Sequence, residues 1–89
     1  MDNSAEILEW VDFVETKAAS LLSESEKLPE NHFADYVSRI EAFIEHETSV
    51  QCRYPRGNKT RMHKVIRYIQ EDLKSMLADL ARIRTKFAF

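Results

Sequence analysis

The residues best suited to chemistry in this chain are the cations that follow its midpoint. Residues 53–67 contain six basic side chains and no acidic one, with one tyrosine and one histidine among them and Tyr68 directly after. Where such a cluster meets the start of a helix, free N–H groups already add positive charge, and a bound phosphate would offset it. This favours nucleic acid or another phosphorylated partner. The residues that could bind it are Arg53, Tyr54, Arg56, Lys59, Arg61, Lys64 and Arg67.

The acidic residues of the first half offer an explanation that needs no ligand. Residues 1–50 carry twelve acids and three bases, a balance of −9, whereas residues 51–89 carry ten bases and three acids, a balance of +7. In an up-down-up bundle, the start of the third helix lies beside the end of the second and the start of the first. We expect the acids there to neutralise the basic segment. The net charge of −2 also disfavours binding to DNA, because DNA phosphates are negative. These acids are Asp2, Glu6, Glu9, Asp12, Glu41, Glu45 and Glu47.

Three histidines and one cysteine could ligate a metal, but their spacing does not fit a known pattern. His32, His46, Cys52 and His63 are separated by 14, 6 and 11 residues, unlike paired-cysteine or Cys₂His₂ sites. Cys52 has no local base to activate it as a nucleophile. The chain has no Gly-rich phosphate loop and no nucleophile elbow. We therefore expect no metal, no cofactor and no enzymatic activity.

A nuclease is the weakest of the alternatives. The spacing of Arg56 and His63 superficially resembles the arginine–histidine signature of small helical ribonucleases. Arg56 falls in a loop that contains Pro55 and Gly57, however, and not one turn from His63 on the same helix. The resemblance therefore implies little about activity.

Composition indicates one small all-α domain spanning residues 1–89. The 89 residues are 44% apolar and 31% charged, typical of a globular chain too short for a core plus a deep substrate cleft. One glycine and two prolines are too few for a protein of many short strands. A single cysteine, with no signal-peptide pattern and no long apolar run, predicts a cytoplasmic location without a membrane partner.

Two amphipathic helices are predicted in the first half. The first covers about 5–25, with an apolar arc roughly 160° wide that needs two neighbours. Asn3 or Ser4 can cap it. The second starts after Pro29 and covers about 30–47. Their apolar residues are Ile7, Leu8, Trp10, Val11, Val14, Ala18, Leu21 and Leu22 in the first, and Phe33, Tyr36, Val37, Ile40, Phe43 and Ile44 in the second.

The third predicted helix is the longest and covers about 60–87, after a basic loop at 48–59 with Asn58 or Thr60 as cap. Its apolar residues alternate in steps of four and three, an unbroken heptad pattern of about 40 Å. The fold class is therefore an antiparallel three-helix bundle with a long C-terminal heptad-patterned helix. The heptad residues, widened by Val65 and Leu77, are Met62, Ile66, Ile69, Leu73, Met76, Leu80, Ile83 and Phe87.

Several apolar residues are expected to remain uncovered within one chain. Phe13 falls on the polar side of the first helix, and Tyr68 lies off the heptad stripe of the third. The third helix is longer than the other two, so Ile83, Phe87 and Phe89 should overhang and be buried by a second copy. We therefore predict a non-enzymatic protein–protein interaction module acting as a homodimer. The alternative is a nucleic-acid-binding regulator that uses Arg53–Arg67.

Overall fold

The computed structural model describes residues 3–87 and confirms the all-α bundle of three helices. The elements are α1 (Ser4–Ser25), a short 3₁₀ helix η1 (Glu30–His32), α2 (Phe33–Thr48) and α3 (Lys59–Phe87). Pro29 is extended, with ψ near 145°, and the three residues that follow it form η1 before the α-helical geometry begins. No strand occurs within residues 3–87. The predicted helix bounds are accurate to within three residues.

Short polar contacts define where the helices begin and end. The Asn58 side chain caps α3, because its Oδ1 accepts the Arg61 N–H at 3.0 Å. At the other end of the connection, Ser49 closes α2 in the left-handed region (φ 59°) and donates its N–H to the Glu45 carbonyl at 2.9 Å. Asn3 takes the N-cap position of α1, but its side chain makes no capping hydrogen bond.

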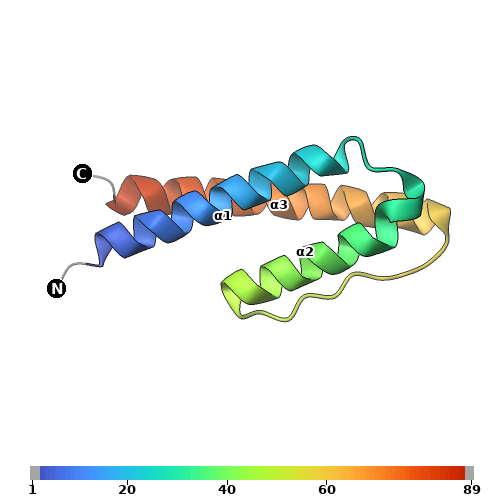
Figure 1. Cartoon of the computed structure of the whole chain (residues 1–89), viewed down its shortest axis with the longest axis horizontal. Helices are drawn as coiled ribbons and strands as arrows, with labels where there is room; N and C mark the ends of the chain where they lie inside the picture. Colours follow the sequence, from blue (N-terminus) through green and yellow to red (C-terminus); the bar gives the residue numbers. More distant parts are fainter. Residues whose placement is uncertain (1–2, 88–89) are drawn as a thin grey trace.

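The helices do not follow the expected up-down-up order, because α2 and α3 run parallel (Figure 1). His63, in the first turns of α3, contacts Glu30 at 3.2 Å and packs edge-on against the Phe33 ring at the start of α2. The far end of α3 lies beside the first half of α1, where Arg84 binds Asp12 and Glu15. Therefore α1 is antiparallel to both other helices.

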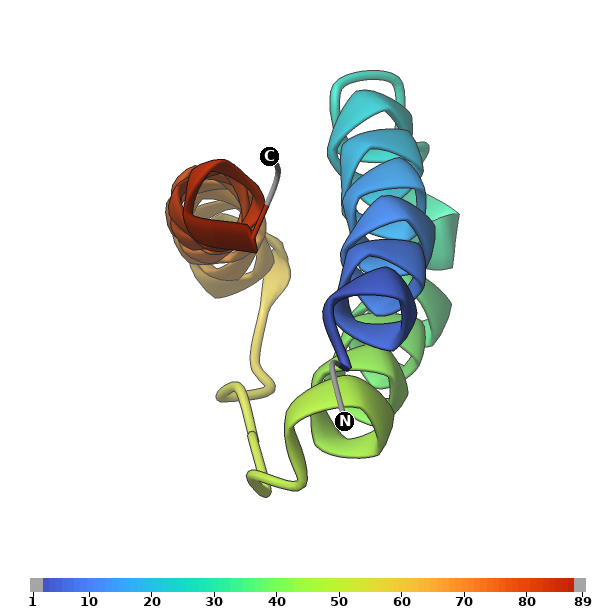
Figure 2. The same cartoon turned by 90° about the vertical axis from the view of Figure 1, so that its left-hand side faces the viewer.

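The connection between α2 and α3 makes this order possible. Residues 49–58, here called the strap, run back along α2 in an extended course and lie on the side between α2 and α3 (Figures 1 and 2). Ten extended residues span roughly 33 Å, whereas the 16 residues of α2 rise only about 24 Å. The strap is thus long enough to return the chain to the start of α2.

The core lies mainly between α1 and α3, which pack together more extensively than any other pair. The heptad residues of α3 from Met62 to Ile83 face it as predicted, although Met76 and Ile83 are only partly buried. Phe87 is partly buried but does not belong to the core cluster. From α2, the Tyr36 hydroxyl donates to the Leu21 carbonyl at 2.7 Å, and burial raises the pKa of Tyr36 to about 12. The fully or nearly buried apolar residues are Val11, Val14, Ala18, Leu21, Phe33, Tyr36, Val37, Ile40, Phe43, Met62, Val65, Ile66, Ile69, Leu73 and Leu80.

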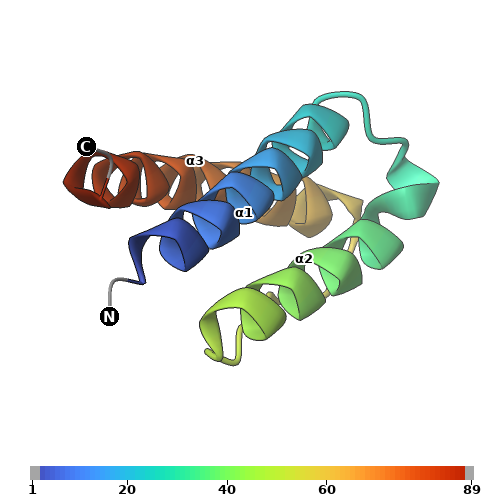
Figure 3. The same ribbon diagram turned by 60° about the vertical axis from the view of Figure 1, so that its left-hand side comes forward.

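The overhang is at a different place from the one expected. The end of α1 reaches only Gln70, whose side chain donates to Ser25 at 2.9 Å, so the start of α3 outruns α1 and is covered by η1 and α2. The C-terminal part of α3 lies beside α1 instead of projecting alone. Both helices extend past the end of α2 on that side (Figures 1 and 3), and there they form a two-helix arm.

Within the described residues, no helix combines the length and the hydropathy that crossing a bilayer requires.

Candidate interaction surfaces

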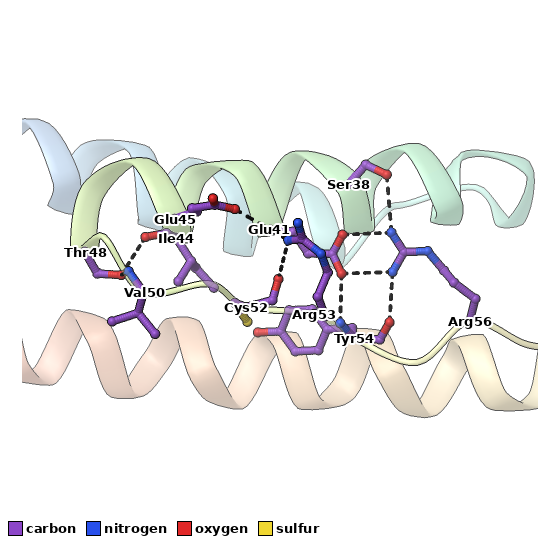
Figure 4. A network of polar contacts seen from close by, with 10 residues as sticks. All are labelled: Ser38, Glu41, Ile44, Glu45, Thr48, Val50, Cys52, Arg53, Tyr54 and Arg56. Carbon is purple, nitrogen blue, oxygen red and sulfur yellow. Dashed lines mark hydrogen bonds and ion pairs between the residues drawn. The ribbon is translucent and has the colours of Figure 1, made fainter.

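Glu41 organises the first part of the basic segment. It is a buried residue of α2 with 7% exposure, and its carboxylate accepts hydrogen bonds from Arg56 at 2.8 and 3.1 Å and from the Tyr54 N–H at 2.8 Å (Figure 4). The Arg56 guanidinium is the main cause that holds the pKa of Glu41 below its usual value, with the Tyr54 N–H adding to it against the opposing effect of burial. Three donors on one buried carboxylate fix the strap to α2.

Two further contacts complete the attachment of the strap. The Tyr54 hydroxyl donates to Asp72 of α3 at 2.6 Å, and burial together with the nearby Asp72 raises the pKa of Tyr54. Arg53 lies 3.5 Å from Glu45 and donates to the Cys52 carbonyl (Figure 4). Arg53, Tyr54 and Arg56 are therefore engaged within the chain, where they hold the strap between two helices.

The second part of the basic segment is free of such contacts. The side chains of Arg61, Lys64 and Arg67 are exposed on α3, and they form no ion pair with any residue that the structure describes. Tyr68 lies among them and is 58% exposed. The Lys59 side chain lies outside the described part of the chain. The predicted site is thus divided into strap residues that are paired with other residues of the chain and α3 residues whose side chains are exposed.

Only some of the acids predicted to neutralise the basic segment pair with it. Glu41 and Glu45 of α2 do pair with it, whereas Glu47 contacts Trp10 and His46 instead. Asp12 does not, because α1 is antiparallel to α3 and Asp12 meets Arg84 at the opposite end of that helix. For the same reason, Glu6 and Glu9 at the start of α1 are remote from the start of α3, and Asp2 lies outside the described residues. Parallel packing of α2 and α3 is the cause of the difference.

A groove of about 450 Å³ lies between α1 and α2, and Phe13, which is 56% exposed, lines it. Leu21 and Phe43 are buried in its floor. We call it the α1–α2 groove. Phe13 was predicted to lie on the outer side of its helix, and the structure shows that it borders this hollow. The residues lining the groove are Phe13, Lys17, Leu21, Arg39, Ala42, Phe43, His46 and Glu47.

A second, smaller groove of about 300 Å³ occupies the two-helix arm just past the end of α2. Met76 and Ile83 are partly buried in it, and Trp10 is 39% exposed. We call it the arm groove. Phe87 is also partly buried near the end of α3, whereas Phe89 lies outside the described residues. The lining residues are Trp10, Thr48, Asp72, Ser75, Met76, Asp79, Leu80 and Ile83.

Sequence reasoning missed two features of these surfaces. Glu41 was treated as one surface acid among several, although its position four residues after buried Val37 on an amphipathic helix was a signal of burial. Trp10 was assigned to the apolar arc of the first helix. Its ring is partly exposed, and its Nε1 donates to Glu47 at 3.1 Å.

No metal site is formed by the described residues, since no three of their His, Cys, Asp or Glu side chains gather closely enough to hold an ion. Cys52 is a free, half-buried thiol.

Comparisons of the chain with protein-family models, with curated proteins and with solved structures gave no significant match.

Proposed function

We propose that this chain is a non-enzymatic protein–protein interaction module that acts as a homodimer. The observation that carries the proposal is the short reach of α2, which leaves the arm groove open between α1 and α3. Trp10 and Ile83 lie on opposite walls of that groove, from α1 and α3. Apolar side chains from two helices in one hollow are typical of a protein interface.

A second copy is the simplest cover for the arm groove. A closed two-fold dimer lets the same patch serve both subunits, and Phe87 near the end of α3 extends the apolar surface. The contact would be mainly apolar, so it should persist in 0.5 M salt, where exposed ion pairs are screened. A cytoplasmic location, suggested by the single cysteine, belongs to this proposal.

Sedimentation velocity of the full chain at tens of micromolar tests the dimer. We expect the wild type to sediment as two chains in 0.5 M salt, and the Ile83→Lys variant as one chain with unchanged helix content. Trp10→Lys, at a more exposed position of the same groove, should also give monomers. Thr85→Lys is the matched control, because Thr85 is exposed on α3 and does not line the groove. A monomeric wild type would contradict the dimer.

Nucleic-acid binding is the second candidate function, supported by the exposed Arg61, Lys64 and Arg67. If each contacts one phosphate, log K should fall with log salt at a slope of roughly −3 on duplex DNA. A gel shift at low salt, with duplex and single-stranded probes, compares the wild type with the variant in which all three are Gln. A salt-sensitive shift that this variant loses would favour nucleic acid, whereas no shift of the wild type would eliminate this function.

A further inference from the structure

We infer that the outer side of α3, near its start, binds single-stranded nucleic acid, with phosphates on Arg61, Lys64 and Arg67 and a base stacked on Tyr68. We call these four residues the α3 patch. The inference rests on nucleic-acid binding, the second candidate function above, and names the form of nucleic acid. The α3 patch shares no residue with the arm groove, which lies toward the opposite end of the bundle (Figure 1).

The α3 patch occupies a short part of one helix face. At 100° per residue, its four side chains leave α3 within an arc of about 120°. The buried residues Ile66, Ile69 and Leu73 lie outside that arc. From Arg61 to Tyr68 the helix rises about 10 Å. A short segment of one strand can therefore contact the whole patch at once.

The end of the strap supports the first residue of the patch. Gly57 has no side chain, and a Cβ at this position would come within 2.6 Å of the Arg61 Cδ, so glycine lets the arginine stem lie against the strap. The Arg61 N–H is already bound by the Asn58 cap. The α3 patch therefore consists of side chains and does not depend on free N–H groups at the helix start.

The positive charges of the α3 patch are not offset within the chain. Its three cations form no ion pair with any residue that the structure describes. The next acids along α3 are Glu71, which is exposed, and Asp72, which accepts the Tyr54 hydroxyl. Glu30 of η1 contacts His63. Although the whole chain is negative, the local balance is thus positive and attracts an anionic ligand.

The surroundings of the α3 patch favour a polyanion over an acidic protein. Protein interfaces have an apolar centre. Among the described residues of α3, however, Tyr68 is the one large apolar side chain that is exposed. A hollow of about 540 Å³ beside the patch is lined by small and polar residues and by two of the cations. Phosphate contacts give affinity without an apolar interface. The residues lining the hollow are Gly57, Asn58, Thr60, Arg61 and Lys64.

Tyr68 favours a single strand over a duplex. An exposed tyrosine alone is ordinary, but this ring is 58% exposed and lies among three unpaired cations. Proteins that bind single strands combine such rings, on which bases stack, with cations that contact the phosphates between them. In a duplex the face of each base is covered by the next base pair. The ring would then have no partner, and only the phosphate contacts would remain.

Fluorescence anisotropy with labelled oligonucleotides tests this inference. The probes are a thymidine strand of about 12 nucleotides and a duplex of the same length, both at low salt. We expect the full-length protein to bind the strand about tenfold or more tightly than the duplex. Tyr68→Ala should weaken binding of the strand about tenfold and change binding of the duplex little, because only stacking is lost. Tyr68→Phe keeps the ring and should retain the preference for the strand.

Phe13→Ala is the matched control, because Phe13 is about as exposed as Tyr68 but lies on α1. It should bind both probes as the wild type does, and circular dichroism should show unchanged helix content in all variants. Equal losses in Tyr68→Ala and Phe13→Ala would overturn the inference.

The two nucleic-acid probes separate this inference from the function on which it rests. Equal binding of strand and duplex would overturn the inference and leave the second candidate function in place, whereas binding of neither would overturn both. A labelled polyglutamate peptide is the third probe. If it binds as tightly as the strand, the α3 patch recognises an acidic protein and the inference is wrong.

Discussion

At the scale of single residues, Glu41 has the largest structural role of the acids in this chain. A carboxylate on the buried side of a helix is unfavourable unless it is paired and hydrogen-bonded. Here Arg56 and the Tyr54 N–H satisfy it. The same contacts remove Arg56 from the set of cations available to a ligand. One residue thus both secures the strap and removes one cation from the basic site that the sequence suggested.

Glu41→Gln should destabilise the protein by about 1–3 kcal/mol at pH 7, because it weakens charge-assisted hydrogen bonds to a buried acceptor. The pKa of Glu41 is lowered from 4.5 in the folded state. Its contribution is therefore fully present above the pKa of the unfolded chain and is lost as the pH falls through the lower, folded-state pKa. Urea unfolding at pH 7 and below pH 4 should show the difference between wild type and variant shrinking in acid.

Glu45→Gln is the control for that measurement. Glu45 also pairs with a strap arginine, but both side chains are at least half exposed, so the loss should stay below about 1 kcal/mol. If the two variants lose the same amount of unfolding free energy at pH 7, Glu41 does not anchor the strap.

At the scale of elements, the helices could be predicted from the sequence and their relative directions could not. Heptad spacing identifies α3 and its buried side, because a repeat of apolar residues defines a face whatever lies against it. The same pattern carries no information on whether the neighbouring helix is parallel or antiparallel. That choice depends on the strap, whose length permits a return along α2 and whose contacts with Glu41 and Asp72 hold it there.

Leu73→Ala should cost about 2–5 kcal/mol of unfolding free energy, since Leu73 is fully buried at the centre of the α1–α3 contact. Met76→Ala is its matched comparison, one turn further along the same stripe but only partly buried beside the arm groove. It should cost clearly less. Chemical denaturation of both variants measures the difference, and similar losses would mean that burial does not decline toward the end of α3 as the structure shows.

At the scale of the whole molecule, the acidic first half of the sequence neutralises the basic second half only in part, although we predicted that it would do so. The acidic first half does meet the basic second half, but through Arg53 and Arg56 on one side and Arg84 on the other. Arg61, Lys64 and Arg67 remain exposed because the start of α1, which should have covered them, lies at the far end. The candidate residues were identifiable from their types, whereas their separation into engaged and free groups required the chain's course in space.

The strap also affects the folding reaction. Because it returns the chain before α3 begins, the principal helix pair joins residues as distant in sequence as Asp12 and Arg84, 72 positions apart. Loop-closure entropy rises with the length of the loop, and folding rates fall as contacts become less local. We expect refolding, followed by stopped-flow fluorescence of Trp10, to be slower than is usual for helical bundles of this length; a microsecond phase that recovers the full signal would contradict this. Until α1 and α3 have packed together, the apolar side of α3 stays exposed to other chains, so aggregation competes with folding.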